Sequence, residues 1–155
     1  EEMYQTVMSN AKDFDILIST AAIADYKPAN YSKTKYKKYE NNIFIEFTRG
    51  ADIISSVSEK NRDLFTVGFA AETDSLKKNA EDKLIKKNLD MIVGNIANHE
   101  LKLGFESDFN KVTIFTKERV IEIPEAKKSE IAIKILNIVA KEFTSKISLV
   151  NKNVK

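Results

Sequence analysis

Two lysines spaced four residues apart are the clearest candidates for binding a charged ligand. Lys83 and Lys87 lie in a lysine-rich stretch with a helical pattern, and side chains at this spacing project from one face of a helix. With no acidic residue between them on that face, two ammonium groups could hold a triphosphate as point charges. A solvated surface pair without a ligand explains the same spacing.

A second group of lysines lies in a polar segment that we expect to be a mobile loop. Lys35, Lys37 and Lys38 alternate around Tyr36. A loop of this kind can close over an anionic reaction centre and neutralise charge that develops there. The alternative is an exposed hairpin edge that its lysines protect from pairing.

Three segments rich in small or polar residues each follow or end an apolar run, at residues 20–26, 68–73 and 94–95. In open parallel sheets, ligands bind beyond the carboxyl ends of the strands. Small side chains such as those of Ala21 and Ala22 let a ligand approach the backbone closely. Tight packing explains any one segment, but the three together predict a ligand site at this edge of the sheet.

Other catalytic schemes have little support in the sequence. There is no cysteine, and His99 is the only histidine, so neither a thiolate nucleophile nor a histidine-based metal site or triad can be built. The four glycines are spread singly. The glycine-rich fingerprints of dinucleotide-binding and P-loop proteins are therefore absent from this sequence.

The elements that must position these residues alternate between strand and helix. Short apolar runs typical of buried strands occur at residues 15–19, 64–70 and 90–94, and helical patterns at residues 1–11, 52–61 and 75–88. This alternation predicts an α/β fold, a Rossmann-like three-layer domain with a mostly parallel sheet between helices.

Further elements complete the predicted domain. We expect a β-hairpin extension in which residues 43–47 pair with residues 36–39, and a tight turn at Gly50. A terminal hairpin is expected from residues 111–117 and 120–123. A final helix over residues 128–147 is expected to pack through Ala132, Leu136, Val139 and Phe143.

Composition favours one globular domain over residues 1–155. The formal net charge of +2 from 25 basic and 23 acidic residues argues against a dedicated nucleic-acid binder. No apolar run approaches the roughly 20 residues that span a membrane. With no signal-like start and no cysteine, a cytoplasmic setting is expected. Because the first helix begins without a capping residue, we expect the domain to be truncated at its N-terminus.

Five blocks resemble the phosphopantothenoylcysteine synthetase family, and they come in that family's order. They are AAIADYKP at residues 21–28, KYKK at 35–38, GFAAET at 68–73, KLIKKNLD at 83–90 with Gly94-Asn95 after it, and GFESDFN at 104–110. The likeness covers residues from about 15 to 145. It is strongest to the bacterial synthetase that usually follows a flavin-dependent decarboxylase in one bifunctional polypeptide.

The resemblance implies a ligase of coenzyme A biosynthesis that joins 4'-phosphopantothenate to L-cysteine through an acyl-cytidylate formed from CTP. It also implies Mg²⁺ accompanying the nucleotide, and FMN only if a decarboxylase domain is fused upstream. The family dimerises through the hairpin near residues 35–47, so a homodimer is expected, with no nucleic-acid or membrane partner.

The family's site residues transfer to positions that match its motifs. The resemblance places Lys35 in the conversion of the acyl-cytidylate, as a catalytic residue on a lid, and Ala21 and Ala22 beside the substrate. The implied nucleotide contacts are Asp25, Lys35, Gly50, Ala51, Asp52, Ile53, Phe69, Lys83 and Lys87. Gly50 and Ala51 replace the family's more usual Asn-Pro, a departure that bears on the geometry of that contact and not on the fold.

The family's first strand, its glycine-rich turn, and the arginine and asparagine that engage phosphopantothenate have no counterpart in this sequence. The alternative function is therefore a nucleotide-binding fragment or module without complete ligase turnover. A generic NAD-binding domain would need the glycine fingerprint that is missing here.

Overall fold

A five-stranded mixed sheet forms the body of the protein. The computed structural model describes residues 1–31, 34, 42–96 and 107–153, with only the backbone for residues 150–153. The strands are β1 (Ile16–Ser19), β4 (Phe65–Glu72), β5 (Met91–Ile96), β6 (Phe109–Thr116) and β7 (Val120–Lys127), in the order β1-β4-β5-β6-β7. β1, β4 and β5 run parallel, whereas β6 and β7 form an antiparallel hairpin beside β5.

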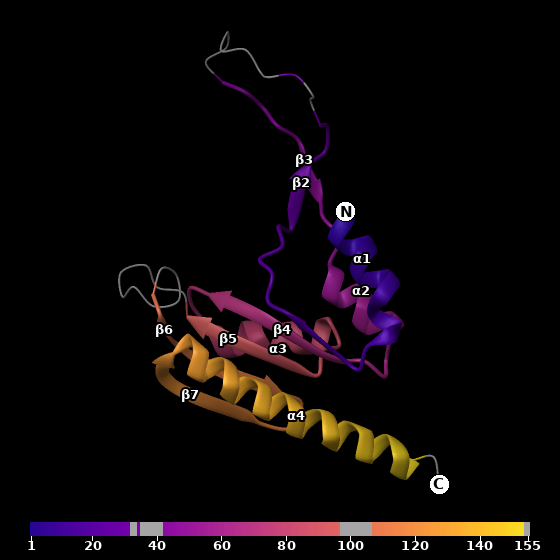
Figure 1. Ribbon diagram of the computed structural model, residues 1–155. Coiled ribbons are helices and arrows are strands. Elements are labelled where there is room, and N and C mark those ends of the chain that lie inside the picture. Colours follow the sequence, from indigo (N-terminus) through magenta and orange to yellow (C-terminus); the bar gives the residue numbers. More distant parts are fainter. Residues whose placement is uncertain (32–33, 35–41, 97–106, 154–155) are drawn as a thin grey trace.

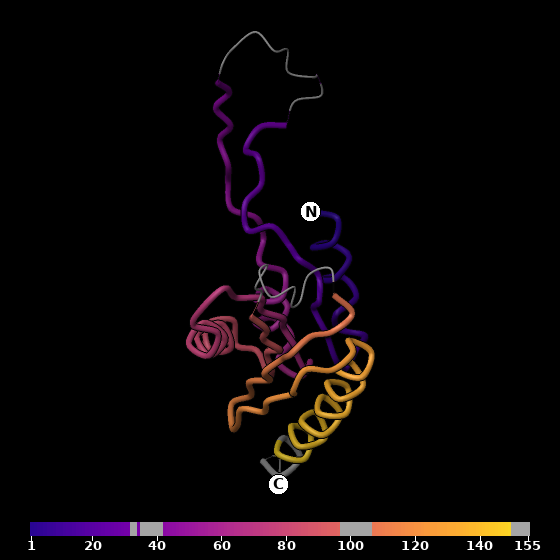
Figure 2. The backbone as a smooth tube through the Cα atoms, turned by 90° about the vertical axis from the view of Figure 1, so that its left-hand side faces the viewer, coloured from indigo at the N-terminus to yellow at the C-terminus, as the bar shows by residue number. Residues whose placement is uncertain are grey.

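Helices cover both faces of this sheet. The helices are α1 (Glu2–Asn10, followed by a 3-10 turn at Ala11–Asp13), α2 (Ile53–Lys60), α3 (Leu76–Lys86) and α4 (Lys128–Asn153). α3 and α4 lie on opposite sides of the sheet (Figure 2). The predicted three-layer α/β architecture is therefore confirmed. Among the described residues, no helix has the length and apolarity to cross a membrane.

The alternation of side chains along the strands divides the core into two layers. On one face, Phe65 and Val67 of β4 pack with Ile131 and Val139 of α4. On the other face, Ile92 and other strand residues pack against α3 and α2, and α1 adds a smaller cluster around Val57 of α2.

The predicted buried face of α4 is confirmed at Val139 and Phe143 and wrong at Ala132 and Leu136. Ile131, Ile135 and Val139 face the sheet and are 4, 6 and 2% exposed, whereas the predicted Leu136 is 54% exposed. Apolar residues occur all around this helix, so its pattern is compatible with more than one face. Leu136 and Ala132 instead border a separate apolar groove beside β1.

A two-stranded arm leaves the body between β1 and α2 (Figure 1). β2 (Tyr26–Pro28) pairs antiparallel with β3 (Phe47–Arg49), and we call these strands together with residues 29–31 and 42–46 the arm. The predicted strand at residues 43–47 is wrong except at Phe47, because residues 42–46 have no regular structure. No described layer covers this stretch, so strand formation there would bury nothing. The predicted pairing partner, residues 36–39, lies outside the described residues.

The terminal hairpin is longer than predicted. Its second strand was expected to end at residue 123, before Pro124, but β7 continues through this proline. β7 is an edge strand, and its pairing with β6 shifts between Val112↔Ile123 and Asn110↔Ala126. Pro124 lies in this bulge, where its missing N–H costs no ladder hydrogen bond. The strand therefore continues to Lys127.

Candidate functional site

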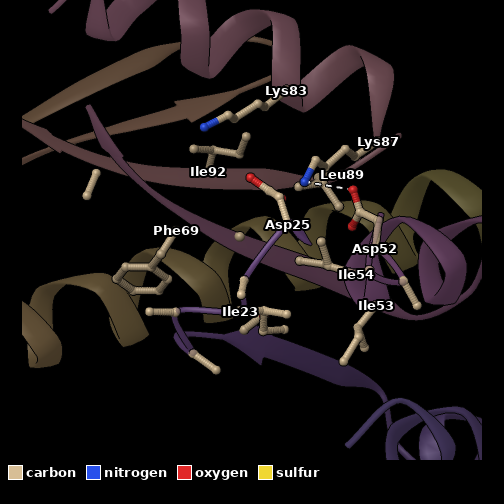
Figure 3. Close-up of a pocket in the computed structure, with 18 of the residues that line it drawn as sticks. Ile23, Asp25, Asp52, Ile53, Ile54, Phe69, Lys83, Lys87, Leu89 and Ile92 are labelled. Atoms are coloured by element: carbon tan, nitrogen blue, oxygen red, sulfur yellow. Dashed lines mark ion pairs between the residues drawn. The ribbon is translucent and has the colours of Figure 1, made fainter. Parts of the chain in front are cut away.

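A cleft of about 540 Å³ opens beyond the carboxyl ends of β1 and β4 (Figure 3). Its lining comes from residues 19 and 21–25 after β1, residues 49–54 leading into α2, residues 68, 69 and 71 of β4, and residues 83, 87, 89 and 92. This is the edge of the sheet at which the sequence predicted a ligand site. Gly94 and Asn95, the third predicted segment, do not line it; Gly94 packs against Leu76 instead.

The predicted binding residues that the structure describes come together in this cleft. They are Ala21, Ala22, Asp25, Gly50, Ala51, Asp52, Ile53, Phe69, Lys83 and Lys87. They come from segments far apart in the sequence. Lys35 and His99 lie outside the described residues.

Both candidate phosphate-binding lysines form ion pairs. Lys83 Nζ lies 2.5 Å from Glu72 Oε1, and Lys87 Nζ lies 2.8 Å from Asp52 Oδ2. The carboxylates come from the end of β4 and from the turn before α2, so the helical spacing alone did not predict them. The two lysine side chains stay 44 and 31% exposed, which leaves their remaining N–H groups accessible to an anion.

The N-terminus of α2 forms a second wall suited to an anion. Asp52 is the N-cap, and its side chain accepts a hydrogen bond from the backbone N–H of Ser55 at 3.2 Å. Ile53 and Ile54, in the first turn, border the cleft. Free N–H groups and the positive end of the helix dipole favour phosphate at such a position.

Gly50 lies shortly before α2, where the sequence predicted a tight turn, and it allows the backbone to pack closely there. Its φ lies outside the left-handed range, but an added Cβ would lie 3.0 Å from the carbonyl oxygen of Ala24. The N–H of Gly50 donates to the carbonyl of Asp25 at 2.8 Å. This contact fixes the turn before α2 against the segment that follows β1.

Part of the cleft surface is apolar. The ring of Phe69 is 42% exposed and borders the cleft together with Ile23, Leu89 and Ile92. Figure 3 shows Phe69 apart from the two lysines, with Asp25 between them. The cleft therefore offers cations at one end and an aromatic surface at the other, an arrangement that suits a nucleoside polyphosphate.

Three residues of this region were missed by the sequence reasoning. Arg49 lines the cleft and has no ion pair within the described part of the chain; its position directly before the predicted turn was the available signal. Glu72 accepts a hydrogen bond from Lys83, and Asn79 in turn donates one to Glu72. The acidic residue inside the GFAAET segment was a signal for Glu72, but nothing marked Asn79.

The model of one protein family matches residues 1–143, and its description is DNA/pantothenate metabolism flavoprotein C-terminal domain. Similar curated proteins are the coenzyme A biosynthesis bifunctional proteins CoaBC of Vibrio cholerae and Borreliella burgdorferi. The first is 39% identical over 142 residues, which is 89% of this chain and 35% of the relative. The second is 40% identical over 140 residues, 88% of this chain and 35% of the relative. The chain thus spans about a third of the length of these relatives.

Solved structures of related proteins are also similar to this chain. The C-terminal domain of coenzyme A biosynthesis bifunctional protein CoaBC superimposes with a TM-score of 0.71 at 32% identity, covering 94% of this chain and 62% of that domain. The DNA/pantothenate metabolism flavoprotein from Streptococcus pneumoniae gives a TM-score of 0.71 at 20% identity, covering 90% of this chain and 68% of that chain. The second likeness shows a shared fold.

Proposed function

The chain belongs to the family of DNA/pantothenate metabolism flavoprotein C-terminal domains, and on that premise we propose that it carries the nucleotide site of a phosphopantothenate–cysteine ligase. The reaction joins 4'-phosphopantothenate to L-cysteine through an acyl-cytidylate made from CTP, in coenzyme A biosynthesis. One observation carries this proposal: the described residues that the resemblance assigns to the nucleotide and the substrate line one cleft.

The proposed chemistry has two steps. In the first, a carboxylate oxygen of 4'-phosphopantothenate attacks the α-phosphorus of CTP, the bond to the β-phosphate oxygen breaks, and pyrophosphate leaves. In the second, the amine of cysteine attacks the acyl carbon of the acyl-cytidylate. An amide bond forms, the amine loses a proton, and CMP leaves with the oxygen that joined it to the acyl group.

Each wall of the cleft has a role in this reaction. Lys83, Lys87 and the N-terminus of α2 hold the phosphates, and Phe69 supports the nucleoside. Ala21 and Ala22 admit the acid substrate close to the backbone. A Mg²⁺ ion bound with the triphosphate would neutralise part of its charge, and Asp25 and Asp52, which line the cleft, would be the residues to offer it carboxylate oxygens.

The sequence-based expectations for Lys35 are part of the same proposal. Its loop closes over the acyl-cytidylate, and the ammonium group neutralises charge that develops in the second step. We also infer a homodimer through the arm, because Ile43, Phe44 and Ile45 of the arm are 54, 95 and 54% exposed, an apolar surface that a second copy would cover. The cytoplasmic setting stays a prediction from composition.

Product analysis tests the proposed activity. The natural polypeptide, with any residues that flank this chain, is incubated with 4'-phosphopantothenate, L-cysteine, CTP and Mg²⁺, and the products are identified by mass spectrometry. We expect phosphopantothenoylcysteine, CMP and pyrophosphate, and the acyl-cytidylate when cysteine is omitted. If neither ligated product nor pyrophosphate forms, the proposed function is wrong.

A second candidate is a nucleotide-binding module without complete ligase turnover, since the same cleft would hold the nucleotide in either case. Under this alternative the same incubation would show bound CTP without the ligated product.

A further inference from the structure

Glu72 lies behind Lys83 and does not line the cleft. It is the last residue of β4, and its side chain is 14% exposed. Its Oε1 accepts a hydrogen bond from Lys83 Nζ at 2.5 Å, and its Oε2 accepts one from Asn79 Nδ2 at 3.0 Å. Both oxygens of this carboxylate are therefore engaged by α3.

The spacing on α3 explains why one carboxylate meets both donors. Asn79 and Lys83 lie four residues apart on the helix and so project from one face. Rotation of the Glu72 carboxylate would break at least one of the two bonds. The two bonds therefore fix the end of β4 against α3 and hold a carboxylate at a set position next to the ammonium group.

Lys83 and Lys87 differ in where their acidic partners lie. Asp52, the partner of Lys87, itself lines the cleft and places its negative charge beside an incoming ligand. Glu72 bonds to Lys83 from outside the lining. Because an ammonium group has three donors, Lys83 can keep its bond to Glu72 and still donate to an anion in the cleft.

We propose that Glu72, held by Asn79, is a positioning residue that fixes the Lys83 ammonium group for the polyphosphate of the bound nucleotide. The inference rests on the proposed nucleotide site. A free lysine side chain loses rotamer entropy when it is immobilised on a ligand. Because the ion pair with Glu72 already restricts the Lys83 side chain in the free protein, less entropy is lost when the nucleotide binds, and binding becomes tighter.

A double-mutant cycle tests this role. Binding of CTP with Mg²⁺ to the natural polypeptide is measured by calorimetry for the wild type, Glu72→Ala, Lys83→Ala and the double variant. Glu72→Ala is expected to weaken binding by about tenfold, the equivalent of about 1.4 kcal/mol, and to have no further effect when Lys83 is already alanine. Glu72→Gln is expected to weaken binding less, because its amide oxygen still accepts from Lys83.

The matched control is Asp82→Asn. Asp82 pairs with Lys86 on the same helix at 3.9 Å, and neither residue lines the cleft. Its loss should leave binding unchanged. In steady-state assays, Glu72→Ala should raise the KM for CTP more than it lowers kcat, and the thermal midpoints of all variants report folding.

Different results overturn different statements. If Glu72→Ala weakens binding equally with and without Lys83, or if Asp82→Asn weakens it as much, Glu72 does not act through Lys83. Unchanged binding in Glu72→Ala has the same meaning. If the wild type binds neither CTP nor ATP, the proposed function falls, and this inference falls with it.

Discussion

At the scale of one residue, Asp52 both stabilises α2 and forms an ion pair with a lysine of the cleft. Its carboxylate caps α2 by accepting from Ser55 and also pairs with Lys87. The first contact satisfies a free N–H at the start of the helix. The second holds one of the two lysines that we assign to the phosphates. A substitution at this position can therefore separate the two effects.

We predict that Asp52→Ala lowers the free energy of unfolding by about 1 kcal/mol, because the N-cap is lost. Asp52→Asn should cost clearly less, since asparagine caps as well as aspartate and an exposed ion pair contributes little. Urea unfolding of both variants measures the difference. Equal losses would show that the cap does not contribute to stability.

Lys35 carries a prediction from sequence alone. In the natural polypeptide, Lys35→Gln should still bind CTP and form pyrophosphate, but it should accumulate acyl-cytidylate, because the charge that assists the second step is gone. Quenched-flow sampling with mass spectrometry follows the intermediate. Normal product formation by this variant would remove Lys35 from the mechanism.

At the scale of elements, the sheet determines which face of α4 is buried, because the sequence of the helix is compatible with more than one face. Ile135 is buried against the sheet, whereas Leu136 is more than half exposed at the border of the groove beside β1, although the two are neighbours of similar size. The sheet buries the stripe that contains Ile131 and Val139.

This pair gives a matched prediction. Ile135→Ala should destabilise the protein by about 2–5 kcal/mol, because it leaves a cavity in the core. Leu136→Ala should cost less than about 1 kcal/mol, because Leu136 is more than half exposed. Chemical unfolding of both variants checks the phase of the helix. A larger loss at Leu136 would support the face expected from the sequence.

The elements that could be predicted are those whose burial pattern is unambiguous. The runs that became β1, β4 and β5 are apolar and short, and α2 is marked by Asp52 at its start. The stretch at residues 43–46 is just as apolar, but it lies on the arm, where no described layer buries it. The hydrophobicity of a segment indicates a tendency to be buried, but whether another element packs against it depends on the tertiary fold.

Within the site, too, residues in local sequence patterns could be predicted, whereas contacts between distant elements could not. Small residues after strands and paired lysines are local patterns, so Ala21 and Lys83 could be named from the sequence itself, whereas Asp25 was implied by the family resemblance. The ion pair between Glu72 and Lys83 joins a strand end to a helix 11 residues away, and helical periodicity does not connect these positions. Contacts of this kind require the tertiary structure.

At the scale of the whole molecule, the arm carries exposed apolar residues away from the sheet (Figure 1). If the arm is a dimer interface, Phe44→Asp should weaken the dimer at least about tenfold, because burying an unpaired charge is costly. Sedimentation velocity over a range of concentrations measures the association. The exposed Ile85 on α3 provides a control, and Ile85→Asp should leave the association unchanged. A monomeric wild type, or an unaltered dimer in Phe44→Asp, would contradict this role of the arm.

The proposed function depends on the binding of a nucleoside triphosphate in the cleft between β1, α2 and α3. Calorimetric titration with CTP and with ATP, each with Mg²⁺, tests it most directly, using the wild type, the variant Lys83→Ala/Lys87→Ala and the control Lys86→Ala. We predict that CTP binds more tightly than ATP, that the double variant weakens CTP binding by about 100-fold or more because two charge-assisted contacts are lost, and that the control binds as the wild type does. Binding of neither nucleotide by the folded wild type, or equal binding by the double variant, would contradict the claim.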